Sequence, residues 1–234
     1  MTRPYSSVAV CAAAFAVLFL AGCSKPPEQP KSAEEKAATP PAQPAPPAEQ
    51  PKPAEAPPAD TNKVPATFKV KLDTSKGPIE IEVHRDWAPR GADQFYKLVK
   101  SGFYDSARFF RVVPNFVVQF GLAANPATTK KWEKPIPDDP VLQTNRVGSI
   151  VYATAGPNTR TTQLFINLRS NQMLDSQGFA PFGMVLGDGM KIVQEIYAGY
   201  GEQPDQDAIT HQGNAYLTGK FPKLDFIKKA TIEN

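Results

Sequence analysis

The chain has 234 residues, of which 41% are hydrophobic and 21% are charged, and its formal net charge is +3. A single long apolar run argues against a polytopic membrane protein, while two Cys and 15 Gly argue against a disulfide scaffold and against collagen. Because 26 Lys and Arg are balanced by 23 Asp and Glu, we expect no nucleic-acid partner.

Residues 1–22 have the features of an export signal. Arg3 supplies positive charge, and residues 8–20 form an apolar run that is short for a membrane span. The run ends in Leu20-Ala21-Gly22-Cys23, which resembles the lipobox of bacterial lipoproteins. That resemblance implies cleavage before Cys23, lipidation of its sulfur and anchoring in a lipid bilayer. The alternative is an ordinary secretory signal with an incidental Cys.

Residues 23–65 are expected to form a lipidated, disordered tether rich in Pro and Ala. More than half of the 25 Pro lie between Pro26 and Pro65, and the segment contains no Phe, Leu, Ile, Trp or Tyr. Such a composition cannot bury enough apolar surface to offset the loss of chain entropy on folding. A ligand for a Pro-binding module is the alternative. Ser24 stands where a signal for retention in the inner membrane typically has Asp, so the resemblance favours the periplasmic face of an outer membrane.

From residue 66 to residue 234 the pattern is that of one folded domain. Apolar and polar residues alternate over 68–72 and 79–83, on either side of a turn, which predicts a hairpin of half-buried strands. Further strands are expected at 108–113, 116–120, 149–154, 163–167, 182–186 and 225–232, and helices at 90–101 and 189–198. Spacers too short for repeated βαβ units predict a mainly β protein, an antiparallel barrel or sandwich with two helices.

The usual sequence signatures of hydrolases, nucleotide-binding proteins and zinc proteases are missing from this domain. His84, on the polar face of a strand, and His211, in a polar loop, are expected to be solvated, so we expect no metal and no cofactor. Asp138, Asp139 and Asp175 could serve a glycosidase, but nothing in the sequence pairs them.

Three stretches carry the strongest signal. The first is Phe109-Phe-Arg-Val-Val-Pro-Asn-Phe-Val-Val-Gln-Phe-Gly121, in which one strand turns back into another, so that Arg111, Phe116 and Gln119 can project toward a shared surface. The others are residues 152–167 and 173–183. In order, they resemble the motifs F-H-R-V-I-P-G-F-x-x-Q-G-G, A-x-A-x-P-x-x-x-x-S-Q-F-F-I and L-D-x-x-x-x-x-F-G of the cyclophilin family of peptidyl-prolyl cis-trans isomerases.

This resemblance implies an eight-stranded antiparallel closed barrel capped by two α-helices, and isomerisation of Xaa-Pro bonds. It implies that Arg111 is the catalytic Arg, aided by Phe116 and Gln119. The residues that it places against the peptide are Val117, Ala153, Thr154, Phe165, Met173, Leu174 and Phe179. Without the family pattern, the residues would favour a simpler interpretation, with the aromatic residues in the core, Arg111 as a surface ion-pair partner and Gln119 as a polar residue on a strand face.

Several positions depart from the family motifs. Phe110 replaces the usual His before the Arg, Phe120 replaces Gly, and Leu164 replaces Phe. Met173 falls where many eukaryotic members have Trp, and Phe179 falls near the family's pocket His. None of these changes removes Arg111, so the motifs still indicate an enzyme.

The chemistry fits the sparse inventory of reactive groups. Isomerisation breaks no bond, and its barrier of ~18–20 kcal/mol comes from lost amide resonance. A catalyst therefore needs an apolar socket and a donor for the twisted amide rather than a nucleophile. We expect a monomeric, lipid-anchored isomerase of exported, Pro-containing polypeptides. A chaperone-like module that binds Pro segments with little turnover, or a structural envelope lipoprotein, is the alternative.

Overall fold

The computed structural model describes residues 64–233, which belong to one compact unit of the chain, Ala54–Asn234. The expected signal peptide, Cys23 and nearly all of the tether lie outside the described residues. Within residues 64–233, no helix is both long and apolar enough to cross a bilayer.

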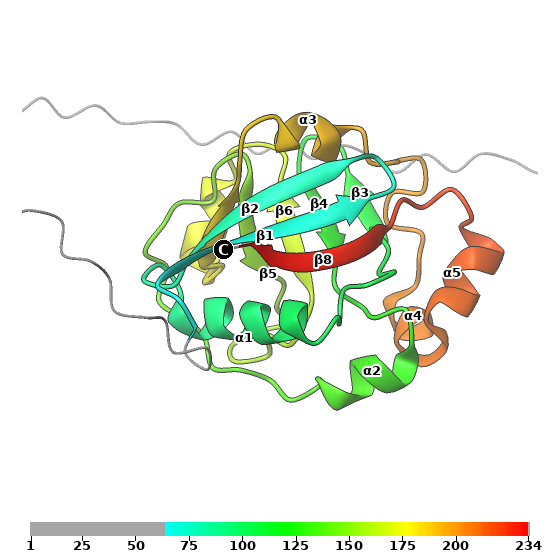
Figure 1. Cartoon of the computed structure of the whole chain (residues 1–234), viewed down its shortest axis with the longest axis horizontal. Coiled ribbons are helices and arrows are strands. Elements are labelled where there is room, and N and C mark those ends of the chain that lie inside the picture. The colour runs from blue at the N-terminus through cyan, green and yellow to red at the C-terminus, as the bar shows by residue number, and fades with distance from the viewer. Residues whose placement is uncertain (1–63, 234) are drawn as a thin grey trace, which may run out of the picture. The chain divides into compact units, whose positions relative to one another are not determined.

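The domain is built on one antiparallel sheet of eight strands (Figure 1). The strands are β1 (Thr67–Thr74), β2 (Pro78–His84), β3 (Arg111–Val113), β4 (Val117–Phe120), β5 (Ser149–Tyr152), β6 (Leu164–Asn167), β7 (Pro181–Val185) and β8 (Ile227–Glu233). Their order in the sheet is β3-β4-β6-β5-β7-β2-β1-β8. The predicted hairpin is confirmed as β1 and β2, and every other predicted strand overlaps an observed one.

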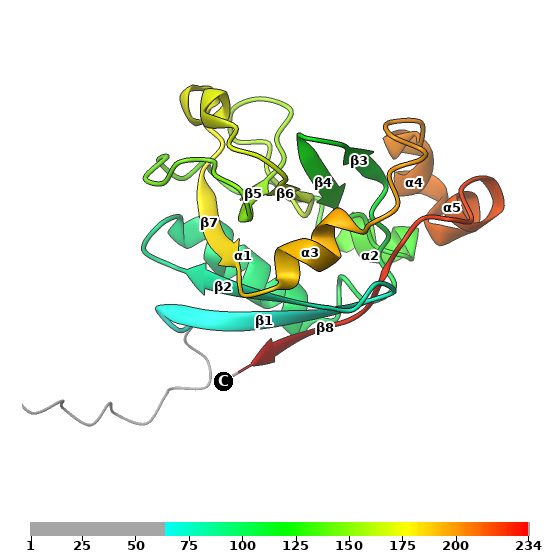
Figure 2. The ribbon, with the colours of Figure 1, turned by 90° about the horizontal axis from the view of Figure 1, so that it is seen from above.

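The expectation of a closed barrel is wrong. The sheet curls strongly (Figure 2), but β3 and β8 remain at its two edges and do not pair with each other. The chain before β3 meets the start of β8 and the residues before it, through an isolated bridge between Arg108 and Phe226 and backbone hydrogen bonds of Ile227 with Ser106 and Ala107. Beyond that bridge other groups occupy the strand edges: the N–H of Val112 donates to the carbonyl of Gly201, and the N–H of Ala230 donates to the Asp105 carboxylate.

The expectation of only two helices is also wrong. The helices are α1 (Pro89–Lys100), α2 (Pro126–Lys131), α3 (Gly189–Gln194), α4 (Gln206–Gln212), α5 (Asn214–Lys220) and the 3-10 helix η1 (Gln172–Gln177). Those predicted correspond to α1 and α3. Helices α4 and α5 are short, and each buries one apolar side chain, Ile209 or Leu217, so their hydrophobic periodicity is too weak to read. His211 therefore lies in α4, not in a loop.

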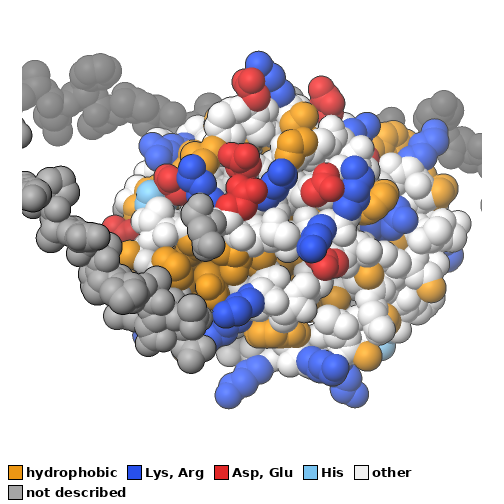
Figure 3. Space-filling view, viewed as in Figure 1, with side chains coloured by type: hydrophobic (Ala, Val, Ile, Leu, Met, Phe, Trp, Pro, Cys, Tyr) orange, Lys and Arg blue, Asp and Glu red, His pale blue; other side chains and the backbone are white. Residues whose placement is uncertain are grey.

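Positively and negatively charged side chains are intermixed over the outer face of β1 and β2, the face that is turned away from the core (Figure 3). The strand register places Lys69 opposite Glu82 and Lys71 opposite Glu80. The other face of these strands carries fully buried Val and Ile side chains of the main core, such as Val70 and Ile81.

A second, smaller core lies beneath α4 and α5. It consists of the buried residues Phe110, Leu122, Ile209, Leu217, Phe221 and Leu224. Phe110, which replaces the family's His, thus packs against the C-terminal helix pair. Phe120, which replaces Gly, lies in the main core, with its ring 5.4 Å from that of Phe109.

Candidate active site

The site lies on the sheet face that is turned away from the main core. In β4, Val118 and Phe120 point into the main core, so the alternation of side chains sends Val117 and Gln119 to the opposite face. The register then aligns four strands across that face: Arg111 lies opposite Gln119, Gln119 opposite Phe165, and Phe165 opposite Val151. Residues distant in sequence therefore form one row across β3, β4, β6 and β5.

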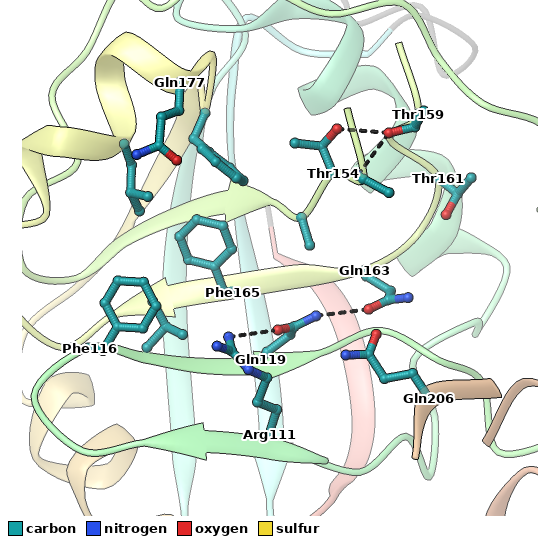
Figure 4. A pocket seen from close by; sticks show the side chains of 15 residues that line it. Arg111, Phe116, Gln119, Thr154, Thr159, Thr161, Gln163, Phe165, Gln177 and Gln206 are labelled. Carbon is teal, nitrogen blue, oxygen red and sulfur yellow. Dashed lines mark hydrogen bonds between the residues drawn. The ribbon is translucent and has the colours of Figure 1, made fainter. Parts of the chain in front are cut away.

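This row forms the floor of a cleft of about 550 Å³ (Figure 4). The lining residues are Arg111, Phe116, Val117, Gln119, Ala153, Thr154, Ala155, Thr159, Thr161, Gln163, Phe165, Leu174, Gln177, Phe179 and Gln206. Of these, Arg111 alone carries a charge. Figure 4 shows Phe116 and Phe165 toward one end and Thr154, Thr161 and Gln163 toward the other, so the cleft has an apolar half and a polar half.

The apolar half is a small socket of aliphatic and aromatic side chains. Val117, Val151, Phe165 and Leu174 are buried there, and the partly exposed Phe116, Ala153 and Phe179 pack against them. The rings of Phe165 and Phe179 meet edge to face, with their centroids 5.7 Å apart. Edge-to-face contact is a favoured arrangement of aromatic rings, so the wall of the socket is firmly packed.

A tight turn brings Phe116 to the rim of the socket. The N–H of Phe116 bonds to the carbonyl of Val113, with Pro114 and Asn115 between them, and Asn115 has a φ of 58°. Pro followed by a residue with positive φ is the pattern of a type II turn, which Asn tolerates. The predicted reversal of the chain between the two strands is thereby confirmed.

Hydrogen bonds from a backbone N–H and from a buried Asn side chain fix the backbone of Phe116. Its carbonyl accepts the N–H of Leu168 at 2.9 Å and the Asn171 side chain at 3.1 Å. Asn171 also donates to Asn167 at 2.7 Å, and both Asn residues are fully buried. Because these groups satisfy one another in the interior, they fix the socket wall in place.

Arg111 is tied into a chain of polar side chains. Its Nη1 donates to Oε1 of Gln119 at 3.1 Å, and Gln119 in turn donates to Oε1 of Gln163 at 2.8 Å. On the other side, Arg111 Nε donates to Oε1 of Glu202 at 2.6 Å. The guanidinium carbon also lies 5.9 Å from the ring centre of Phe116, so the charge sits beside the apolar socket.

The polar half is formed by the loop that precedes β6. Thr159 Oγ1 lies 2.8 Å from Thr154 Oγ1 and accepts the N–H of Ala155 at 2.9 Å. Between Thr159 and Thr161 the loop inserts Arg160, which pairs with the fully buried Asp139 carboxylate at 3.1 Å. A buried ion pair thus anchors the strip of Thr residues.

The structure brings every residue predicted to be catalytic or substrate-binding into this lining except Met173. Met173 lies on η1, and its exposure of 55% and its position leave it outside the lining residues. Sequence reasoning missed Ala155, Thr159, Thr161, Gln163, Gln177 and Gln206. Gln163 could have been found, because it precedes Phe165 by two residues and so shares its strand face. Gln206, on α4, carried no such signal.

The other groups considered from the sequence lie away from the cleft. His84 contacts Glu82 at 3.0 Å, and Nδ1 of His211 donates to the backbone of Asp207 at 2.7 Å. The carboxylates of Asp139 and Asp175 are engaged in hydrogen bonds within the domain, and neither lines the cleft. Among residues 64–233 there is no cluster of three or more His, Cys, Asp or Glu that could hold a metal ion.

Comparison with known proteins places this geometry in a family. Residues 69–214, more than half of the chain, match the family described as cyclophilin type peptidyl-prolyl cis-trans isomerase/CLD. The chain is 38% identical over 132 residues to a peptidyl-prolyl cis-trans isomerase-like 1 of Rhizopus delemar, covering 55% of this chain and 79% of that protein. It is 35% identical over 137 residues to a peptidyl-prolyl cis-trans isomerase of Acinetobacter baylyi, covering 56% and 72%.

The fold agrees with this assignment. A crystal structure of a cyclophilin type isomerase from Cryptosporidium parvum aligns with a TM-score of 0.55 and 21% identity, covering 72% of this chain and 98% of that one. The chain belongs to the cyclophilin family. It is an enzyme, a peptidyl-prolyl cis-trans isomerase.

Proposed function

We propose that this isomerase acts on Xaa-Pro bonds of exported polypeptides, and that Arg111 lowers the barrier by donating to the amide nitrogen as the bond twists. The observation that carries the mechanism is the position of Arg111. It is the only charged group of the cleft lining, and it stands next to the ring of Phe116 and within hydrogen-bond distance of Gln119.

The socket is proposed to hold the pyrrolidine ring. Its walls of Phe116, Phe165 and Leu174 supply apolar contact without a competing polar group, so that a Pro side chain is favoured over a polar one. The polar half, with Thr154 and Gln163, would bind backbone groups of the flanking residues. Such binding would hold the chain on one side of the bond while the other side rotates.

The donor acts mainly in the transition state. In a planar amide the nitrogen lone pair is delocalised into the carbonyl, which makes the nitrogen a poor acceptor. Twisting localises the lone pair, and a guanidinium, which is charged at all relevant pH values, can then donate to it. A group that binds the twisted amide better than the planar one raises kcat.

The test is a protease-coupled isomerisation assay on Arg111→Ala. We expect kcat/KM to fall about tenfold to a thousandfold, equivalent to roughly 1.4–4 kcal/mol of barrier, with little change in peptide affinity. Phe116→Ala should weaken peptide binding as well, because the socket holds the ring in both states. Arg146→Ala removes an exposed Arg outside the cleft and serves as the matched control.

Circular dichroism establishes that each variant is folded. If folded Arg111→Ala retains the parent rate, the catalytic role of Arg111 is refuted. If the parent binds Pro peptides but does not isomerise them, the result supports the alternative of a chaperone-like binding module with little turnover.

We also propose where the enzyme works. The lipobox-like run ending at Cys23 and the Pro-rich residues 23–65 would anchor the domain to a membrane outside the cytoplasm, with Ser24 favouring the periplasmic face of an outer membrane. Its partners would then be exported polypeptides that are still unfolded, met by a monomeric domain on a tether.

A further inference from the structure

Glu202 lies outside every motif of the sequence, yet it contacts the guanidinium of Arg111. It belongs to the segment that joins α3 to α4, 91 residues from Arg111 along the chain. Its Oε1 accepts a hydrogen bond from Arg111 Nε at 2.6 Å and lies 2.6 Å from Nη2. With Gln119 on Nη1, the guanidinium is held from two sides.

The segment that carries Glu202 is itself fixed to β3. The carbonyl of Gly201 accepts the N–H of Val112, the neighbour of Arg111, at 3.2 Å. Beside it, the ring of Tyr200 packs against Tyr197 and Phe221, with centroid distances of 5.1 Å to each. The segment that carries Glu202 is therefore fixed to the strand that carries Arg111, so the relative position of the two side chains is constrained.

We propose that Glu202 is the positioning residue of the reaction, an inference that rests on the proposed role of Arg111. A guanidinium has five N–H donors, and the contacts of Nε and Nη2 with Glu202 and of Nη1 with Gln119 engage three of them, which leaves two donors for the peptide. The rest of the long Arg side chain has several rotatable bonds, and fixing its head reduces the entropy lost when the twisted amide binds.

The solvent exposure of the ion pair indicates that the loss of Glu202 should affect catalysis rather than the stability of the fold. The Glu202 side chain is 63% exposed and that of Arg111 24% exposed. Ion pairs so open to solvent add little to stability, so the loss of Glu202 should leave the fold intact. What it removes is the fixed orientation of the donor.

The opposite role would leave a different signature. If the carboxylate merely competed with the peptide for the guanidinium, its removal would free Arg111 and speed the reaction. A rise in rate would thus identify Glu202 as an inhibitor of Arg111 and overturn the proposal.

The experiment compares the full chain with Glu202→Ala, Glu202→Gln and the control Glu195→Gln, an exposed Glu at the end of α3. We expect Glu202→Ala to lower kcat about threefold to tenfold with KM within twofold. Glu202→Gln, whose amide oxygen can still accept from Nε, should recover part of the rate, and the control should match the parent. An unchanged or higher rate in Glu202→Ala, or a loss carried by KM, overturns the proposal.

Two further arms separate this proposal from the proposed function. In an Arg111→Ala background, Glu202→Ala should cause no further loss, and an equal loss there overturns positioning through Arg111. In ¹⁵N-labelled chain, the Nε–H signal of Arg111 should shift on Glu202→Gln, and an unshifted signal refutes the pairing whatever the activity. If Arg111→Ala alone is as fast as the parent, the Arg-assisted mechanism itself fails.

Discussion

Tyr104 and Tyr152 are both buried in the main core, but their hydroxyl groups differ. The hydroxyl of Tyr104 donates to the carbonyl of Thr162 at 3.1 Å, whereas that of Tyr152 is buried without a hydrogen-bond partner. An unpaired buried hydroxyl loses its hydration and gains no hydrogen bond in return. The two side chains therefore contribute differently to stability, although both rings are packed.

Substitution by Phe tests this difference. We expect Tyr104→Phe to lower the free energy of unfolding by about 1 kcal/mol, and Tyr152→Phe to leave it unchanged or to raise it slightly. Urea denaturation followed by circular dichroism measures both values. A larger loss in Tyr152→Phe than in Tyr104→Phe would show that the Tyr152 hydroxyl has a partner.

Burial also makes these residues sensitive to alkaline pH. It raises the pKa of both Tyr104 and Tyr152 well above the ordinary value. A group whose pKa is higher in the folded state than in the unfolded state stabilises the fold fully below the unfolded pKa, near 10, and this stability is lost as the pH rises further. Denaturation at increasing pH should therefore show stability falling above about pH 10, and less steeply in Tyr104→Phe.

The site residues that could be predicted from the sequence are those that lie in ordered motifs or on strands with clear alternation. Arg111, Gln119 and Phe165 each lie on a strand whose period of two fixes the exposed face. Glu202 and Gln206 were not predicted, because they lie outside the strands and only the tertiary fold brings them to the site. Met173 was placed by the motif, but η1 presents it to solvent, outside the cleft lining.

At the element scale, the N-terminus of α1 depends on a side chain from a distant loop. Ala88, at the N-cap, provides no side-chain hydrogen bond, and the Asp139 carboxylate accepts the N–H groups of Arg90 and Gly91 instead. The same carboxylate pairs with the buried Arg160. One group therefore secures both a helix end, where free N–H donors need partners, and the Thr-lined loop of the cleft.

Asp139→Asn should accordingly be costly. It leaves the buried Arg160 charge without its main partner, so we expect the free energy of unfolding to fall by roughly 3–5 kcal/mol. Asp138→Asn is the control, because its carboxylate also contacts Arg160 but is 34% exposed. An equal loss in both variants in denaturant titrations would argue against the special role of Asp139.

Short helices set the limit of prediction for elements. Helix α1 has a wide apolar face and was predicted, and the six-residue α3 was predicted because Val193 and the following Ile196 are apolar, whereas α2, α4 and α5 are about as short and bury only one residue each. Isolated helices of this length are not stable on their own, and tertiary packing decides whether they form. For α4 and α5 that packing is the small core around Phe110.

The main error of the sequence-based prediction was the closure of the barrel. Alternation predicts strands and their faces, but it does not say whether the first and last edges of a curled sheet meet. Here the Gly201 carbonyl and the Asp105 carboxylate take backbone donors of β3 and β8. These contacts join residues far apart in sequence, which a local pattern does not encode.

Membrane anchoring is testable on the whole chain. Cys23→Ser should abolish labelling by a fatty-acid analogue and leave the chain uncleaved or soluble, because the sulfur is the proposed point of lipid attachment. Cys11→Ser is the matched control and should label like the parent. Equal labelling of Cys23→Ser and the parent would rule out the lipoprotein interpretation.

The pairing of β1 with β8 has a consequence for folding during synthesis. These are the first and last strands of residues 64–233, and they pair from Lys69 with Glu233 to Asp73 with Lys229. Because the chain is synthesised from its amino end, β1 keeps one unpaired edge until β8 has left the ribosome. Such long-range closure slows folding, and a bare edge invites pairing with other chains. We therefore expect the domain to be open to proteolysis and aggregation until residues 227–233 have paired with β1.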